Sequence, residues 1–258
     1  MTVHSPIYPG RSATPHVQFV GAGPGDPGLL TVAALRAIES AEVILHDRLV
    51  SDAILALAPA RTRLIAVGKE GFGPSIPQSR INDVLIIEAL RGPGVVRLKA
   101  GDPGVFGRLD EETRALDAAG IDWSIVPGIS AATAAAASLG QSLTRRGRNA
   151  TMRIVSAQSA DGLTDCDWAD LARRGAVTAF YMGKRAAPHI QTQLLAAGAD
   201  PDTPVDIVEN ASRPSERVVR TVLSSLADDL AAARMSGPAV ILVGLVRADA
   251  HILLETVR

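Results

Sequence analysis

The sequence predicts an α/β protein built from two α/β units. From His16 onward, short runs rich in β-branched residues alternate with segments of helical periodicity, a pattern typical of domains with a mainly parallel sheet. Near Ser130 a run of small residues, SAATAAAASLG, interrupts the alternation; such a run can pack closely against another element or let a ligand approach. We expect a first domain at 16–130 and a second at 131–258, preceded by a disordered tail at 1–15.

Each half is expected to contain five strands and three helices. In the first half the strands are predicted at 17–20, 43–46, 63–67, 95–99 and 123–126, and the helices near 30–40, 77–90 and 110–119. Pro77 suits the first turn of the second helix, and Gly120 suits the end of the third. In the second half the strands are predicted at 151–157, 177–182, 205–209, 217–223 and 239–246, and the helices near 168–174, 186–197 and 225–235.

The composition argues against several classes of protein. The 26 Lys and Arg balance 27 Asp and Glu, and a net charge of -1 gives no general electrostatic attraction to nucleic acid or an anionic membrane. The apolar run at 239–246 is too short to cross a bilayer. The single cysteine, Cys166, excludes an internal disulfide and is expected to be an inert thiol. Because no secretory signal is visible either, we expect a cytoplasmic protein.

A glycine-rich turn, GAGPGDPG, directly follows the first predicted strand. Residues 23–28 match the dinucleotide fingerprint G-x-G-x-x-G, and Asp47 closes the second strand about 20 positions later, so nicotinamide binding is one alternative. Pro24 and Pro27 argue against it, because each removes an amide donor that a pyrophosphate would need. The loop offers carbonyl oxygens and a rigid wall, which suit a neutral or cationic ligand better. A tight turn without any ligand is the other alternative.

A second glycine-rich loop, AGDPGVFGR, follows the fourth predicted strand. Ligands bind at the carboxyl ends of strands in open α/β sheets, so we expect the two loops to face one crevice. Together with other segments of the chain, they resemble the uroporphyrinogen-III C-methyltransferases, within the tetrapyrrole methylases, which are class III S-adenosylmethionine methyltransferases. The resemblance rests on nine blocks in the family's order and spacing: GAGPGDPGLLT, HDRLVS, VGK, LKAGDPGVFGR, VPGIS, LTRR, FYMG, VENASRP and GPAVILVG.

The resemblance implies a two-domain tetrapyrrole methylase fold, usually a homodimer, with the active site in the cleft between the domains. It also implies S-adenosylmethionine as the cofactor and S-adenosylhomocysteine as its product. No metal is expected, because methyl transfer needs none and the five histidines lack metal-ligand spacing. The residues that the resemblance assigns to the cofactor are Pro24, Ala100, Gly101, Asp102, Val105, Ser130, Ala131, Met182, Ala211 and Ala239.

The implied reaction is the methylation of uroporphyrinogen III at C2 and C7 to precorrin-2, which feeds sirohaem, cobalamin or haem d1 synthesis. A substrate so rich in carboxylates calls for arginine, because guanidinium groups pair with carboxylates in a bidentate manner. The resemblance assigns substrate contacts to Arg108 and Arg146, and Arg48 and Glu111 are further candidates because Arg48 lies in a family block and Glu111 lies one helical turn beyond Arg108.

Carbon methylation also requires proton handling, since the methylated macrocycle becomes cationic before it rearranges. The resemblance assigns Asp47 as the proton acceptor and Lys69 as the proton donor, and Arg108 is a third catalytic candidate. The alternative for Asp47 is that its side chain caps the helix that follows.

Several residues depart from the commonest pattern of the family, namely Ala100, Gly104, Leu109, Asp110 and Arg145. The pair Leu109-Asp110 matters most, because it places side chains in a loop that the family keeps bare. These departures bear on the identity of the substrate more than on that of the cofactor. The alternatives are therefore another precorrin C-methyltransferase, or a non-catalytic homologue that binds a tetrapyrrole or S-adenosylmethionine.

Overall fold

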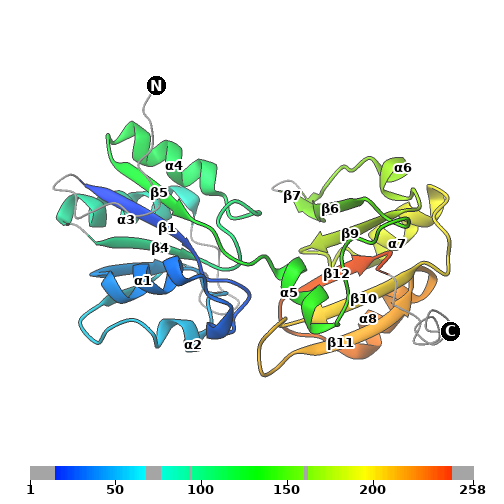
Figure 1. Ribbon diagram of the computed structural model, residues 1–258. Helices are drawn as coiled ribbons and strands as arrows, with labels where there is room; N and C mark the ends of the chain where they lie inside the picture. The colour runs from blue at the N-terminus through cyan, green and yellow to red at the C-terminus, as the bar shows by residue number, and fades with distance from the viewer. Residues whose placement is uncertain (1–14, 68–76, 93, 160–161, 246–258) are drawn as a thin grey trace. The chain divides into compact units, whose positions relative to one another are not determined.

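The chain divides after Ser130 into two compact units, each with a five-stranded sheet of its own (Figure 1). The computed structural model describes residues 15–67, 77–92, 94–159 and 162–245. Nearly all of the predicted tail and the candidate Lys69 therefore lie outside the described residues. Within the described residues, no helix combines the length and apolarity that a bilayer span requires.

The sheet of the first unit has the strand order β3-β2-β4-β1-β5, and all of its strand pairs are parallel. The strands are β1 (His16–Gly21), β2 (Val43–His46), β3 (Arg63–Ala66), β4 (Val95–Lys99) and β5 (Asp122–Val126). This order places β4 between β1 and β2, so the loops that follow these three strands meet at one edge of the sheet. The predicted parallel sheet of the first half is confirmed.

Helices cover both faces of this sheet. They are η1 (Pro27–Leu29), α1 (Val32–Ser40), α2 (Asp52–Leu55), α3 (Gln78–Arg91) and α4 (Leu109–Ala118). Ile38 of α1 and Ile54 of α2 belong to one buried apolar cluster, and Leu85 of α3 and Leu116 of α4 belong to another. Strands covered on both faces are expected to be apolar throughout, which makes the buried charged residues of β4 conspicuous.

The sheet of the second unit is mixed, so the prediction of a mainly parallel sheet is wrong for this half. Its order is β11-β10-β12-β9-β6, and only β6 and β9 pair in parallel; the other three pairs are antiparallel. The seven residues between β10 and β11 are too few for a parallel crossover, and they form a hairpin connection instead. The strands are β6 (Thr151–Ser156), β9 (Ala176–Tyr181), β10 (Pro204–Glu209), β11 (Arg217–Val222) and β12 (Ala239–Val243).

The helices of the second unit pack on its own apolar core. Ile190 of α7 and Leu226 of α8 are buried in a cluster with Phe180 and Ile207 of the sheet. The small-residue run after Ser130 forms a helix that contacts β12. The helices are α5 (Ala131–Ser138), α6 (Trp168–Leu171), α7 (Ala187–Ala196), η2 (Leu223–Ser225) and α8 (Leu226–Ala233), and a small ribbon joins β7 (Gln158–Ser159) to β8 (Gly162–Leu163).

Candidate active site

The two glycine-rich loops are joined by backbone hydrogen bonds. Gly23 and Gly101 exchange both of their peptide hydrogen bonds, at N to O distances of 3.1 and 2.8 Å, and the amide of Ala22 donates to the carbonyl of Lys99 at 2.8 Å. Both glycines have left-handed backbone angles, with φ of +67° and +70°, which side chains disfavour. The loop after β1 and the loop after β4 therefore lie together at the carboxyl edge of the first sheet.

The loop after β5 packs against the same point. A Cβ atom on Gly128 would lie 2.1 Å from the carbonyl oxygen of Gly101 and 2.9 Å from the Cα of Gly21, so this approach requires glycine. Asp102 holds the arrangement: one carboxylate oxygen accepts from the amide of Gly128 at 2.9 Å and the other from Gly104 at 2.8 Å. Asp102, a predicted cofactor residue, thus fixes the loops to one another.

The first loop offers few free amides to a phosphate. Pro24 is buried, and neither it nor Pro27 has an amide proton. The amide of Gly28 donates to the side chain of Asp26 at 2.8 Å, and the amide of Gly23 is already paired with Gly101. The prolines and these paired amides argue against the nicotinamide alternative.

The space beside Gly101 suits a ligand held by shape. Among the described residues, apart from Gly101 and its two chain neighbours, no heavy atom lies within 4 Å of the position that a Cβ of Gly101 would take, so bare backbone faces open space there. Its neighbours Ala100 and Val105 are half-buried, small or apolar, and neutral. Neutral walls with a few polar backbone groups fit an adenosine and methionine moiety better than a polyphosphate. The residues present therefore fit the implied cofactor.

The predicted cofactor residues of the second unit gather at one end of its sheet. Met182 follows β9, Ala211 follows β10, and Ala239 begins β12, where it pairs with the last residue of β10. The hydroxyl of Tyr181 accepts from the amide of Ala132 at 2.8 Å, and this bond brings the start of α5 to the same end.

Met182 has an unusual backbone for a non-glycine residue. Its φ is 55°, in the left-handed region, and the residue stays 48% exposed although its side chain is apolar. A left-handed conformation costs about 1 to 2 kcal/mol in an L-residue, and such strain gathers at functional sites. This geometry is in keeping with the predicted role of Met182, together with its neighbours Ala131, Ala211 and Ala239.

Arg146 lies at the other end of the second sheet. The loop 145–149 precedes β6, and the carbonyl of Arg148 is 3.3 Å from the Cβ position of Gly175, just before β9 begins. A cavity of about 500 Å³ opens at this end, and four arginines contribute to its lining: Arg145, Arg148, Arg173 and Arg174. Within its own unit, Arg146 is therefore not brought to the end that carries Met182.

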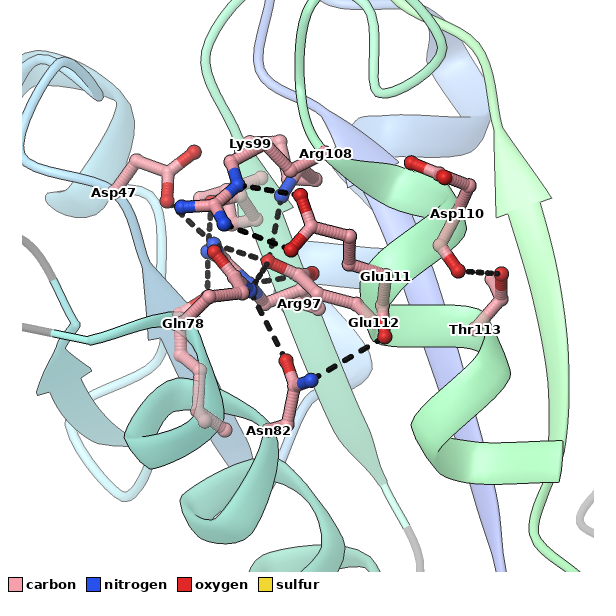
Figure 2. A network of polar contacts seen from close by, with 12 residues as sticks. Asp47, Gln78, Asn82, Arg97, Lys99, Arg108, Asp110, Glu111, Glu112 and Thr113 are labelled. Carbon is pink, nitrogen blue, oxygen red and sulfur yellow. Dashed lines mark hydrogen bonds and ion pairs between the residues drawn. The ribbon is translucent and has the colours of Figure 1, made fainter. Parts of the chain in front are cut away.

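Asp47 lies at the edge of a buried ionic network that Figure 2 shows. Arg97 of β4 donates to the Asp47 Oδ1 at 2.5 Å through Nη2, and through Nη2 and Nε to the two oxygens of Glu112 at 3.0 and 3.1 Å. The side chains of Arg97 and Glu112 are 2% and 1% exposed, whereas that of Asp47 is 32% exposed. Ser51, and not Asp47, caps α2, so the capping alternative for Asp47 is wrong.

Lys99 completes the network. The Nζ of Lys99 donates to Glu112 at 2.9 Å. The Lys99 side chain lies against the second glycine-rich loop, where a Cβ on Gly107 would lie 2.9 Å from Lys99 Cε. Burial lowers the pKa of Lys99, and the nearby Arg97 lowers it further, while Glu112 and Asp47 act in the opposite direction. The network was missed from the sequence; its signal is the pair Arg97 and Lys99 on one face of a strand that should be apolar.

Arg108 and Glu111 form an exposed bidentate pair. Nε and Nη2 of Arg108 each lie 2.7 Å from a Glu111 oxygen, and this hydrogen bonding lowers the pKa of Glu111. Arg108 also has a left-handed φ of 53°. Leu109 packs against the core and Asp110 pairs with Arg114 at 3.2 Å, so the two departing side chains are both engaged on α4.

Arg48 is exposed in the loop after β2, next to Asp47. The first unit thus brings Asp47, Arg48, Arg108 and Glu111 to the same region as the glycine-rich loops, because they all follow strands β2 and β4. Lys69 belongs to the segment beyond β3 that lies outside the described residues.

Together, the fold and these loops define an α/β protein whose glycine-rich turns meet at the carboxyl ends of parallel strands, where ligands bind in such folds. The chain belongs to the tetrapyrrole methylase family: residues 16–227 match the family described as Tetrapyrrole (Corrin/Porphyrin) Methylases. The predicted family and fold class are confirmed.

Individual relatives agree with this membership. The chain is 44% identical to a uroporphyrinogen-III C-methyltransferase of Paracoccus denitrificans over 94% of its own length and 85% of that protein. It is 45% identical to siroheme synthase 3 of Aeromonas hydrophila over 89% of its length, but spans only 49% of that protein. A crystal structure of uroporphyrin-III C-methyl transferase from Thermus thermophilus, complexed with S-adenyl homocysteine, superposes with a TM-score of 0.77 at 38% identity, over 89% of this chain and 97% of that one. The chain thus spans about half the length of the siroheme synthases it matches.

Proposed function

We propose that the chain is a uroporphyrinogen-III C-methyltransferase, which methylates C2 and C7 of uroporphyrinogen III and so makes precorrin-2. The product feeds sirohaem, cobalamin or haem d1 synthesis. One observation carries the proposal: the paired turns of Gly23 and Gly101 leave bare backbone at the carboxyl edge of the first sheet in a tetrapyrrole methylase fold. We call this edge, where the loops after β1, β2 and β4 meet, the ligand edge. The names of the Paracoccus and Thermus relatives support the choice of substrate.

S-adenosylmethionine, when bound, supplies an electrophilic methyl group on a sulfonium centre. The chain's own task is to hold the reacting atoms in line, which needs rigid loops more than a reactive side chain. The residues proposed to hold it are Pro24, Ala100, Gly101, Asp102, Val105 and Ser130 in the first unit, and Ala131, Met182, Ala211 and Ala239 in the second.

The proposed substrate contacts come from Arg48, Arg108, Glu111 and Arg146. The exposed pair of Arg108 and Glu111 can open to engage the tetrapyrrole, because such a pair contributes only about 0 to 1 kcal/mol in solvent. A guanidinium freed in this way binds a substrate carboxylate through two parallel hydrogen bonds.

Asp47 is proposed to accept the proton that leaves the methylated macrocycle, and Lys69 to donate one. The carboxylate of Asp47 is partly exposed at the ligand edge, as a group that meets substrate must be. A carboxylate there also stabilises the cationic macrocycle by its charge.

A transfer assay tests the proposal. Purified chain is incubated with methyl-labelled S-adenosylmethionine and uroporphyrinogen III, and the tetrapyrrole is analysed by mass spectrometry. We expect the label in a doubly methylated product. Binding of S-adenosylhomocysteine without any transfer would indicate the non-catalytic homologue, and label that enters only a later precorrin would indicate another precorrin C-methyltransferase.

We further propose that the protein is a cytoplasmic homodimer with neither nucleic acid nor a membrane as partner. The balanced charge and the single cysteine support the cytoplasmic location and the absence of nucleic-acid and membrane partners, whereas the homodimer is what the family resemblance implies. Sedimentation equilibrium at micromolar concentration tests the dimer, and a monomeric mass would contradict it.

A further inference from the structure

We propose that Arg97 is a positioning residue that holds the carboxylate of Asp47 in the orientation needed to accept a proton from the substrate. The inference rests on the proposed function, because it concerns how that reaction's acceptor is held. It adds a residue that never touches substrate: Arg97 is 1% exposed and lies in the central part of the sheet.

Hydrogen bonds to groups other than Asp47 fix the orientation of the Arg97 guanidinium. Two of its nitrogens bind Glu112, and Nη1 donates to the carbonyls of Leu98 at 3.3 Å and Leu45 at 3.5 Å. With these partners the plane of the guanidinium is set by β4, α4 and the end of β2 (Figure 2). The remaining hydrogen bond, from Nη2 to Asp47 Oδ1, therefore has a defined direction.

The charges of the network balance. Arg97 and Lys99 contribute two positive charges, and Asp47 and Glu112 contribute two negative ones. Three of these four side chains are at most 3% exposed, and only Asp47 reaches solvent. A buried cluster whose one accessible member is a carboxylate presents that carboxylate to the ligand edge in a fixed place.

Besides Arg97 and Lys99 of the network, the described residues with ionisable side chains near Asp47 include its sequence neighbours His46 and Arg48. The Nδ1 of His46 is 3.2 Å from the Asp47 carbonyl oxygen, and the guanidinium of Arg48 is exposed on the next residue. From α3, Gln78 donates to Glu112 at 3.2 Å and adds no charge. Within the described part of the chain, Arg97 forms a salt bridge to the Asp47 carboxylate, so a change at Arg97 should act on Asp47.

The test uses Arg97→Lys, which keeps the positive charge but loses the planar fork. We expect kcat for uroporphyrinogen III methylation to fall roughly tenfold to a hundredfold, as misplacement of a reacting group does, while KM and S-adenosylhomocysteine affinity by calorimetry stay within about twofold. A fall in kcat at unchanged KM and cofactor affinity is expected of a misplaced reacting group and not of a general structural defect.

A double-mutant cycle separates positioning from a general structural role. If Arg97 acts through Asp47, Arg97→Lys should lower kcat no further in an Asp47→Asn background. The matched control is Glu88→Gln, which removes another buried carboxylate bound by two arginines, Arg63 and Arg91, at the opposite edge of the same sheet. That variant should unfold more easily yet keep kcat and KM.

Equal losses of kcat from Arg97→Lys with and without Asp47 would overturn the proposal, as would an unchanged kcat in the single variant. If the wild-type chain fails to methylate uroporphyrinogen III, the proposed function fails on its own. The inference is then decided by a crystal structure of Arg97→Lys: it predicts a displaced Asp47 carboxylate, and an unmoved one contradicts it.

Discussion

Gly101 and Gly120 share a backbone conformation, but Gly101 lies in the loop after β4 and Gly120 lies after α4. Their φ values are +70° and +67°, and among the described residues a Cβ at either position would meet no heavy atom within 4 Å beyond its own chain neighbours. Alanine at either position should therefore cost about 1 to 2 kcal/mol of folding free energy through left-handed strain alone. The two substitutions form a matched pair that isolates the ligand role of Gly101.

We predict that Gly101→Ala weakens S-adenosylhomocysteine binding by roughly tenfold or more, since a methyl group would enter the cofactor space, while Gly120→Ala leaves the affinity unchanged. Urea unfolding gives the stability loss and isothermal titration calorimetry the affinity. Equal affinities of the two variants would count against the proposed cofactor space.

His16 is a residue whose titration should affect stability. Burial lowers its pKa below 6.5, with Asp122 acting in the opposite direction, and its Nε2 is buried without a hydrogen-bond partner in the described part of the chain. The unfolded chain therefore binds a proton at higher pH than the folded one. The stabilising effect of neutral His16 is present above pH 6.5 and is lost as the pH falls through the lower, folded value.

We predict that His16→Gln reduces the loss of unfolding free energy between neutral and mildly acidic pH, because the replacement does not titrate there. Urea unfolding curves of both proteins at several pH values measure this difference. Parallel pH dependence in the two proteins would exclude His16 as a contributor.

Among the elements, α5 is anchored to β9 by one side chain. The hydroxyl of Tyr181 accepts from the amide of Ala132, which as one of the first amides of the helix has no partner inside it. This contact places the start of α5 beside Met182, and both carry proposed cofactor residues.

We predict that Tyr181→Phe lowers the free energy of unfolding by about 1 kcal/mol, the value of a typical hydrogen bond, and weakens S-adenosylhomocysteine binding several-fold. The control is Thr192→Val, which removes an exposed hydroxyl bonded within α7. If Tyr181→Phe binds S-adenosylhomocysteine as tightly as Thr192→Val does, the hydrogen bond from Ala132 to Tyr181 is not needed to position α5 for cofactor binding.

The strands of both units could be predicted because each is a short β-branched run between turn residues. The seven residues between the predicted strands 205–209 and 217–223 already exclude a parallel pairing of β10 with β11. The pairing of β12 with β10 and β9 could not be predicted, because an apolar strand fits a parallel or an antiparallel neighbour equally well. Helix α2 is only four residues long, and α5 consists mainly of alanine without an amphipathic face, so neither shows helical periodicity.

The candidate site, like the fold, could be predicted from the sequence only in part. The glycine loops could be found from the sequence because their turns need glycine and proline at fixed places. The network around Arg97 was missed, because charged residues that alternate with apolar ones, as Arg97 and Lys99 do, usually mark the solvent-facing side of a strand. Their place in a strand expected to be covered on both faces is the signal that could have revealed it. The position of Arg146, away from Met182, depends on sheet topology, which the motif itself does not contain.

For the whole molecule, the apolar clusters of the described residues each belong to a single unit. Leu226 and Leu85 are fully buried counterparts in the second and first unit. We propose that the units unfold as separate domains with a boundary near Ser130.

Leu226→Ala should therefore lower the midpoint temperature of one calorimetric unfolding transition, and Leu85→Ala that of the other. The loss of unfolding free energy in each case should be the about 2 to 5 kcal/mol typical of such cavities. Differential scanning calorimetry of both variants without ligand measures this. A single transition that both substitutions shift together would show that the units unfold as one.

The central claim is that the turns joined at Gly23 and Gly101 hold the methyl donor. A crystal structure of the chain with S-adenosylhomocysteine tests it most directly. We predict the ligand against the backbone of Ala100, Gly101 and Asp102, in the space beside Gly101. A ligand bound elsewhere, such as in the arginine-lined cavity of the second unit, would contradict the claim.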